Sequence, residues 1–421
     1  MKNLIFATSL LLLTAQVNAQ QQPTAPDIPI PAPKVNVTTH SFNKVGTSEV
    51  HSSVYVVKNQ SHPVTANDNG NSYTSNDQDQ SDDPVKTKTF SKSFAVDKSD
   101  KINLSNIYGS ITIKTWAKNE IKVDADMKAF ANTDAEAQDL LDKASIVASK
   151  EGDDVTFRTK IEETSRNWGI GSKNGKKWRR ELKIYMVVYL PANNPLTAAQ
   201  QYGNLLLDDY AGPTSLKVQY GNLTAGDLTN ANNYIAIQYG KGVLQNVNAA
   251  RIKHQYGGGL KIGNMNDLEL DAQYTGVEIG NVKNNAQIKH QYGRGTTIAS
   301  AGSLSFTAQY ASVTVGRLSG TLTGKIQYGK LSVESVEPGC KIFNVDSEYG
   351  AVTVGFAANY HAEFDVNTSY GSFKYGSNVT AKRNGGEDRG YSSSKSYSGQ
   401  IGNGGPNKIN IKVDYNSVTF K

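Results

Sequence analysis

A tyrosine recurs at nearly constant spacing through the second half of the chain, and this repeat constrains the fold more than any other feature. Successive tyrosines lie 18, 19, 17, 18, 18, 18, 18, 21 and 21 residues apart. A fixed period near 20 residues is typical of a solenoid, in which each repeat stacks on the one before. The ten tyrosines are Tyr202, Tyr220, Tyr239, Tyr256, Tyr274, Tyr292, Tyr310, Tyr328, Tyr349 and Tyr370.

Each repeat is interpreted as a short strand that ends at the tyrosine, followed by a second short strand. The column four residues before the tyrosine is apolar except for Gly324, and Leu216 is a representative member. Period-two alternation then predicts that this column, the column two before the tyrosine and the tyrosine itself face the core. The residue immediately before the tyrosine, a glutamine from Gln201 to Gln327, is expected to face outward.

Neighbouring repeats should place identical side chains about 4.8 Å apart. At that spacing a column of glutamine amides can pass hydrogen bonds from repeat to repeat, and stacked tyrosines can make offset aromatic contacts. Glycine follows the tyrosine in eight of the ten repeats and permits a tight corner; Thr275 and Ala311 are the exceptions. Asp271 lies between Lys253 and Lys289 in one column, so charge pairing between repeats is expected.

Residues 86–195 are interpreted as a strand-rich N-terminal cap with one helix, and residues 196–421 as the solenoid. Thr133 is the expected N-cap of a helix from Asp134 to about Ala148, with Asp134 and Glu136 in its first turn. Alternating polarity predicts strands at Phe90–Val96, Lys101–Ile107, Ser110–Trp116, Ile121–Met127, Val155–Ile161 and Glu181–Leu190.

The start of the chain has the pattern of a secretory signal. Lys2 precedes an apolar stretch from Leu4 to Leu13, and Val17-Asn18-Ala19 is a plausible cleavage site, so residues 1–19 are expected to be a signal peptide. The apolar run is too short to span a bilayer, and no transmembrane segment is expected. Residues 20–85, rich in Pro, Asn and Asp, are expected to be a disordered spacer.

The end of the chain departs from the repeat and then returns to it. Residues 380–405 are rich in Gly, Ser and charge, so we expect a flexible loop there. Ile409 to Phe420 reproduces the repeat pattern and is expected to close the end of the solenoid. An unclosed end would be an exposed edge and an aggregation hazard.

One segment of the cap is a candidate contact for an anionic partner. It combines five cations with a tryptophan, as loops that meet anionic surfaces do. A solvated hairpin connection is the alternative. Its candidate residues are Lys173, Lys176, Lys177, Trp178, Arg179 and Arg180.

The sequence offers no catalytic, cofactor-binding or metal-binding constellation. His254 and His290 share a column but are two repeats apart, about 9.6 Å by strand spacing, which is too far for one metal. Acidic pairs such as Asp208-Asp209 recur at turns and outward positions, without the isolated inward pair of a glycosidase. The single cysteine, Cys340, is expected to be buried and inert. A net charge of +6 over 421 residues does not imply nucleic acid.

The chain resembles the "putative adhesin" β-solenoid family of exported bacterial proteins, common in Bacteroidetes and related to adhesin-head GIN domains. The resemblance rests on Asn106-Ile107-Tyr108-Gly109-Ser110, the Val187-Val188-Tyr189-Leu190-Pro191 lead-in and the tandem Tyr-Gly repeats, and it covers about Lys86 to Lys421. It implies a surface or envelope protein and supplies no catalytic residues.

We therefore predict an all-β protein, a single-chain parallel β-solenoid or β-helix, and favour the right-handed form. A left-handed helix of hexapeptides stays open, although the apolar steps from Leu216 to Ile235 run 7, 5 and 7. The predicted function is a non-enzymatic, adhesin-like binding or structural module of the periplasm or surface, without cofactor. Its expected partner is a glycan or cell-envelope polymer. The alternatives are a carbohydrate-active β-helix enzyme, acting as lyase or hydrolase, and an envelope scaffold that binds another protein.

Overall fold

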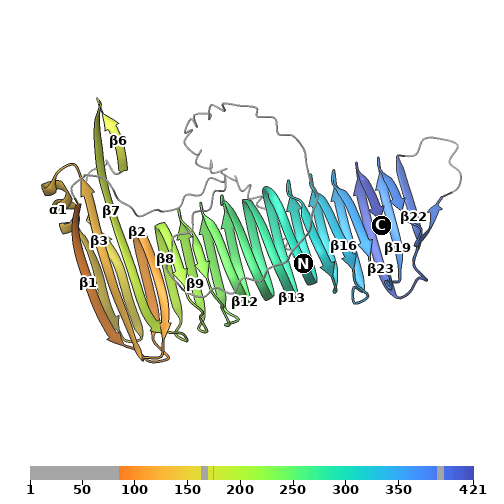
Figure 1. The fold of residues 1–421 in the computed structure, drawn as a ribbon. Coiled ribbons are helices and arrows are strands. Elements are labelled where there is room, and N and C mark those ends of the chain that lie inside the picture. The colour runs from red at the N-terminus through yellow and green to blue at the C-terminus, as the bar shows by residue number, and fades with distance from the viewer. Residues whose placement is uncertain (1–84, 163–168, 174, 386–392) are drawn as a thin grey trace, which may run out of the picture. The chain divides into compact units, whose positions relative to one another are not determined.

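The computed structural model describes residues 85–162, 169–173, 175–385 and 393–421. Within these residues the protein is nearly all β, with a single helix, as predicted (Figure 1). The predicted signal peptide and nearly all of the predicted spacer lie outside the described residues. None of the helical structure within the described part is both long and apolar enough to cross a membrane.

The N-terminal elements combine antiparallel pairs with one strand that belongs to the repeats. The elements are β1 (Val85–Ala95), β2 (Lys101–Trp116), β3 (Glu120–Ala131), α1 (Asp134–Asp142), β4 (Ala144–Glu151), β5 (Asp154–Ile161), β6 (Gly169–Lys173) and β7 (Lys176–Pro191). β1–β3, β3–β7, β4–β5 and β6–β7 are antiparallel. β2 pairs in parallel with β5, β7 and the first strand of the repeats, and therefore joins the two regions.

The predicted helix is correct at its start and wrong at its end. Thr133 caps it as expected, accepting a hydrogen bond from the Glu136 amide at 3.2 Å. The helix stops at Asp142, and Ala144–Glu151 is strand β4, paired with β5. Ile146 and Val147 are β-branched and fit a strand, and the cross-strand partner β5 outweighs the weak local helix preference.

The repeats form consecutive strands that pair in parallel, each with its counterpart in the next repeat. Neighbouring repeats align residue for residue, so Ile235 lies opposite both Leu216 and Ile252. The strands are β8 (Leu196–Leu207), β9 (Thr214–Gln219), β10 (Leu223–Ala225), β11 (Asn233–Gln238), β12 (Lys241–Gln255), β13 (Gly259–Gln309), β14 (Val313–Leu318), β15 (Leu322–Gln327), β16 (Lys330–Val336), β17 (Ile342–Glu348), β18 (Ala351–Phe356), β19 (Ala362–Ser369) and β20 (Ser372–Tyr375).

The core of the repeats is built from the two columns that the sequence assigned to it. The ten repeat tyrosines from Tyr202 to Tyr370 are called the ladder tyrosines below. The side chains four and two residues before each of them are buried, from Leu216 and Val218 to Val366 and Thr368. The one gap in the apolar column, Gly324, is filled by its neighbour, because a Cβ at Gly324 would lie 2.2 Å from the Phe306 ring. These two inward predictions are confirmed.

The last strands do not follow the order of the chain. β21 (Val379–Asn384) and β22 (Ser394–Ile401) form an antiparallel pair on β19, so the predicted loop over residues 380–405 is largely wrong. β23 (Asn407–Asp414) pairs in parallel with β17 on one side and β19 on the other, and Figure 1 shows it beside β19. β24 (Ser417–Phe420) likewise lies between β18 and β20. The terminal repeat is therefore inserted between two repeats, and the prediction that it closes the end is wrong.

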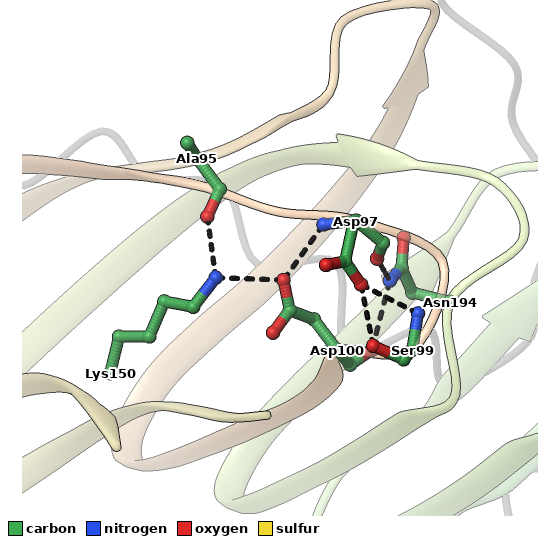
Figure 2. Close-up of polar contacts among 6 residues, drawn as sticks. All are labelled: Ala95, Asp97, Ser99, Asp100, Lys150 and Asn194. Atoms are coloured by element: carbon green, nitrogen blue, oxygen red, sulfur yellow. Dashed lines mark hydrogen bonds and ion pairs between the residues drawn. The ribbon is translucent and has the colours of Figure 1, made fainter. Parts of the chain in front are cut away.

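A buried polar cluster connects β1, β2, β4 and the segment before β8 (Figure 2). The Asp100 carboxylate, 1% exposed, accepts from Lys150 Nζ at 2.8 Å and from the Asp97 amide at 2.7 Å. Lys150 also donates to the Ala95 carbonyl, and the Asn194 amide donates to the carbonyls of Asp97 and Asp100. Because Lys150 and Asn194 come from distant parts of the chain, this cluster ties the turn before β2 to β4 and to the segment before β8.

Candidate functional site

The ladder tyrosines lie on the surface, so the prediction that they face the core is wrong. From Tyr202 to Tyr370 and at Tyr415 their side chains are 40–58% exposed. The reason lies in the backbone: every ladder tyrosine has a positive φ between 51° and 64°. A residue in this left-handed conformation interrupts the strict alternation of a strand, and its side chain turns outward at the corner.

The tyrosine rings form one continuous stack. Each successive ring pair has centroids 4.7–5.3 Å apart and planes within 19° of parallel. Tyr108 joins the stack ahead of Tyr202, and Tyr415 lies between Tyr349 and Tyr370. The tyrosine ladder therefore has twelve members, two more than the sequence analysis counted. The Tyr108-Gly109 motif was the signal for the first of them.

The glycine after the tyrosine is required by close packing between repeats. A Cβ at Gly240 would lie 1.6 Å from the Gly221 carbonyl oxygen of the preceding repeat. The corner backbones therefore touch directly. This contact holds the tyrosines of adjacent repeats at one strand spacing and keeps the stack in register.

Stacking determines which part of each ring a ligand can reach. Inside the ladder both faces of a ring are covered by its neighbours, so only ring edges and phenol hydroxyls meet solvent. An aromatic edge carries partial positive charge and attracts oxygen atoms, and the hydroxyl both donates and accepts hydrogen bonds. The tyrosine ladder is consequently a row of polar contacts suited to an oxygen-rich ligand, with the ring faces unavailable for stacking on sugars.

A row of glutamines runs beside the tyrosine ladder, and its side chains are hydrogen-bonded from repeat to repeat in two runs. Gln201 Nε2 donates to Gln219 Oε1 at 3.1 Å, and Gln219 donates in the same way to Gln238. The pattern resumes at Gln255 and ends where Gln327 donates to the Glu348 carboxylate at 2.8 Å. These half-buried amides hold one another in a fixed orientation.

Open grooves flank the tyrosine ladder. A groove of about 480 Å³ follows the glutamine row from Asn106 to Gln255 and includes Lys217 and Lys253. Another, of about 660 Å³, follows the glycine side and includes Tyr274, Tyr292, Tyr310 and Arg294. The Arg294 guanidinium donates to the Gly258 carbonyl at 2.8 Å, which places a cation in this second groove. Both grooves run with the stack of repeats and are open to solvent.

His254 and His290 lie buried under the tyrosine ladder and are structural. His254 Nδ1 lies 2.9 Å from Thr275 Oγ1 and its Nε2 lies 3.1 Å from the Gly240 carbonyl. His290 Nδ1 lies 2.8 Å from Thr296 Oγ1. Burial holds the pKa of both imidazoles below the ordinary value. Within the described residues no group of three or more His, Cys, Asp or Glu side chains could hold a metal.

The prediction that Asp271 forms ion pairs with Lys253 and Lys289 is wrong. Asp271 Oδ1 is buried without a hydrogen-bond partner, and among the described residues no ion pair joins Asp271 to Lys253 or Lys289. The ion pair between these repeats forms two residues earlier, where Arg251 and Glu269 lie 2.7 Å apart. Side chains directly opposite in parallel strands meet only when their rotamers converge, which the sequence does not reveal.

The candidate anionic-partner segment is a hairpin formed by β6 and β7. Lys176 is exposed and Trp178 is half-buried. Arg179 is buried, lies 3.8 Å over the Phe130 ring and pairs with Glu181 at 2.7 Å. Arg180 lies 3.7 Å from Asp139. The two arginines thus contact β3 and α1, whereas Lys176 faces solvent. The side chains of Lys173 and Lys177 lie outside the described part.

Cys340 is buried, as predicted. Burial raises the pKa of its thiol to about 11, which keeps it protonated and unreactive at neutral pH. Its carbonyl accepts a hydrogen bond from the buried Tyr360 hydroxyl at 3.1 Å. The residue therefore belongs to the packing of the segment before β17.

No family model matches the sequence, and no curated protein matches it either. Among solved structures, a "putative cell adhesion protein" from Clostridium sporogenes aligns over 80% of this chain and 99% of its own, at 10% identity and a TM-score of 0.18. A "putative adhesin" from Parabacteroides merdae aligns over 64% and 95%, at 12% identity and a TM-score of 0.30. A "putative lipid binding protein" from Parabacteroides distasonis aligns over 63% and 95%, at 11% identity and a TM-score of 0.30. These values are too low to transfer a function.

Proposed function

We propose that this chain is an exported, non-enzymatic β-solenoid, of right-handed form, that binds an extended glycan or cell-envelope polymer along the tyrosine ladder. Residues 1–19 would direct export, and residues 20–85 would hold the folded part away from its attachment point in the periplasm or at the surface. The folded part would comprise a cap, residues 86–195, and the repeats that follow.

The observation that carries this proposal is the choice of tyrosine at twelve corners, eleven of them exposed and the one at Tyr108 half-buried. A left-handed corner is formed at lowest cost by glycine, and next by asparagine or aspartate. The fold alone therefore gives little reason for tyrosine at this position. An unbroken row of exposed phenols is better explained by contact with something outside the molecule.

The geometry favours a long, oxygen-rich ligand. From Tyr202 to Tyr328 each repeat adds one phenol and one side-chain amide at the same spacing, so a polymer with its own repeat can make the same contacts several times. Sugar hydroxyls can donate to and accept from both groups. Lys217, Lys253 and Arg294 in the flanking grooves would additionally favour a polymer with some negative charge.

Binding to a polysaccharide panel tests the proposal. The ladder variant replaces Tyr239, Tyr256 and Tyr274 with asparagine, which tolerates the left-handed corner. The control variant carries Val243→Asn, Lys261→Asn and Glu278→Asn, at exposed positions on the following strands. We expect the ladder variant to lose about tenfold or more in affinity for the bound polymer, equivalent to about 1.4 kcal/mol, and the control to change little.

Equal losses in both variants, or no binding to any member of the panel, would remove the tyrosine ladder from consideration. The panel also separates the alternatives. Release of unsaturated or shortened sugars would identify the carbohydrate-active enzyme, and binding only to an envelope protein would favour the scaffold. In the scaffold case, neutralising Lys176 and its neighbours should weaken binding and reduce its salt sensitivity.

A further inference from the structure

The terminal segment, residues 406–421, occupies a position that the chain leaves vacant and fills last. After β18 ends at Phe356, the chain passes over one repeat position, forms β19 and β20, and then the β21–β22 hairpin. Only afterwards does β23 return to pair with both β17 and β19. The acceptor slot, between β17/β18 and β19/β20, is therefore bounded by strand edges that nothing else in the described chain pairs.

The backbone of the terminal segment is bonded on both sides of the slot. β23 aligns with Ile342–Glu348 of β17 and with Ala362–Ser369 of β19, so both of its edges carry a parallel ladder. Two bonds continue past the strand: the Tyr349 amide donates to the Asp414 carbonyl at 2.9 Å, and the Tyr415 amide donates to the Ser369 carbonyl at 2.8 Å. An empty slot would expose two facing rows of strand groups, a template for pairing with another strand.

Side chains give the acceptor slot a specific occupant. Phe420, 1% exposed, makes edge contacts with Phe356, Phe364 and Phe373, at centroid distances of 5.1, 5.4 and 5.0 Å. These rings come from both sides of the slot. Buried aromatic anchors of this kind dominate the energy of protein interfaces.

Polar contacts add alignment to this anchor. Asn410 Nδ2 donates to Asn344 Oδ1 at 2.9 Å on one side, and Lys408 pairs with Glu363 on the other. The Tyr415 ring completes the tyrosine ladder between Tyr349 and Tyr370. A strand shifted by one residue would direct its apolar side chains to the wrong face and lose all of these contacts.

A short turn from Gly402 to Pro406 connects the terminal segment to the β21–β22 hairpin, and Gly402 and Gly404 in it have φ values of 58° and 72°. Short turns that precede a terminal strand are common hinges for exchange of that strand between copies.

We propose that residues 406–421 form an exchangeable strand, which fills the acceptor slot of a second copy of this chain as well as its own. The contacts are the same within one chain and between two, so the balance depends on the hinge and on protein concentration. Because each copy has one donor segment and one slot, reciprocal exchange gives a dimer and serial exchange gives a filament. This inference is independent of the proposed ligand.

A disulfide between copies tests the proposal. In a Cys340→Ala background, one preparation carries Asn344→Cys and another carries Asn410→Cys, which replaces a facing pair in adjacent strands. Strands one spacing apart place their Cα atoms within the range a disulfide can bridge. We expect a disulfide-linked dimer of the two variants after they are unfolded, mixed, refolded at high concentration and oxidised.

A matched pair in the middle of the repeats provides the control. Asn264 donates to Asn246 at 2.9 Å in the same manner, but neither residue belongs to a terminal strand. The Asn246→Cys and Asn264→Cys preparations should not link when mixed. A chain that carries both Asn344→Cys and Asn410→Cys should form the bond internally, which shows that the variants fold. Linked dimers from both pairs alike, or from neither pair while the internal bond forms, would overturn the proposal.

A synthetic peptide gives a second measurement. Labelled peptide 406–421 present during refolding of the full chain should be retained in the slot, in competition with the chain's own segment. The same peptide with Phe420→Ala should be retained about tenfold less, as expected on loss of a buried aromatic anchor. Equal retention of the two peptides would contradict the predicted occupancy.

Discussion

At the scale of single residues, each ladder tyrosine balances two opposing contributions. The left-handed backbone costs an L-residue about 1–2 kcal/mol, and an aromatic pair contributes about 0.5–1.5 kcal/mol. Because an internal tyrosine belongs to two stacked pairs, shared with its neighbours, stacking roughly offsets the strain. The tyrosine ladder is therefore nearly neutral for stability and is available for another role.

Substitution of Tyr274 separates the two contributions. Tyr274→Ala loses the stacking and keeps the strain, so we expect a loss of about 1–3 kcal/mol. Tyr274→Gly also loses the stacking but relieves the strain, so it should be less destabilising than the alanine variant although it removes more atoms. Denaturant unfolding of the two variants gives the order directly.

Ile252→Ala serves as a reference for a core position, because Ile252 is fully buried. It should cost about 2–5 kcal/mol, more than either tyrosine variant. If Tyr274→Gly proved as damaging as the Ile252 variant, the ring would contribute to stability far more than its exposure suggests.

The sequence predicted the inward columns at this scale and failed at the tyrosine. Leu216, Val218 and their counterparts follow a strand period that holds as long as the backbone is extended. The positive φ of the tyrosine ends that period, and no residue-level preference signals it, since tyrosine rarely adopts this conformation. The only clue was the glycine that follows the tyrosine. It correctly predicts a tight corner, but it does not show that the corner turns the tyrosine ring toward solvent.

At the scale of the repeat, the side chain two residues before the tyrosine lies against the residue that follows the tyrosine. His254 lies under Gly257, where a Cβ would come within 2.3 Å of His254 Nε2. The two repeats without glycine after the tyrosine have Thr275 and Ala311 there, and both have alanine two before the tyrosine. A large inward side chain is thus a second reason for glycine at this corner, beside the Gly240 carbonyl oxygen, which a Cβ at Gly257 would approach within 2.5 Å. Alanine two before the tyrosine removes the first of these obstacles.

This relation predicts a rescue. Gly257→Thr alone should destabilise the protein by about 1–3 kcal/mol, because overpacking forces neighbouring groups apart. His254→Ala together with Gly257→Thr reproduces the arrangement of Ala272 and Thr275 and should recover the part of that loss that comes from the His254 ring, whereas the contact with the Gly240 carbonyl remains. The unfolding midpoints of both variants and of His254→Ala alone, measured with heat or denaturant, complete a double-mutant cycle.

If the stability changes of His254→Ala and Gly257→Thr simply added in the double variant, the two side chains would not be in contact. The relation could have been read from the sequence, since both exceptions to glycine coincide with alanine at the partner position. The buried hydrogen bond between Thr275 and His254 could not be read from it, because it joins different repeats and depends on the orientation of the ring.

At the scale of the whole molecule, order in space departs from order in the chain at both ends of the repeats. β2 pairs with β8 although residues 117–195 lie between them in the chain, and the terminal segment lies between earlier strands. The repeat pattern predicted that these segments are of the same kind as the others, and that part was correct. Their positions follow from long-range pairing, which a local pattern does not encode.

Deletion of one complete repeat should preserve the fold. Removing residues 275–292 joins Tyr274 to Gly293, restores a Tyr-Gly corner and shortens the tyrosine ladder by one ring. Because each repeat contacts only its neighbours, we expect a folded protein with a slightly lower unfolding midpoint and an unchanged type of circular dichroism spectrum.

Deletion of residues 275–283 is the control. Half a repeat moves the following strands out of register and should give an aggregated or unfolded product. If the full-repeat deletion were equally damaging, stability would depend on the total number of repeats and less on contacts between neighbours.

The corner at which glycine meets the backbone of the preceding repeat also has an evolutionary consequence. Each repeat contains its own strands, its own corner and the surface that the next repeat needs. The strands that pair with the outermost repeat strands, β5 and β7 on β2 and β22 on β19, lie outside the repeated region. Replication slippage that adds or removes one unit in frame would therefore change the length of the protein without disturbing either end. Natural variants should therefore differ by whole repeats. Selection would then act on the length of the repeated region.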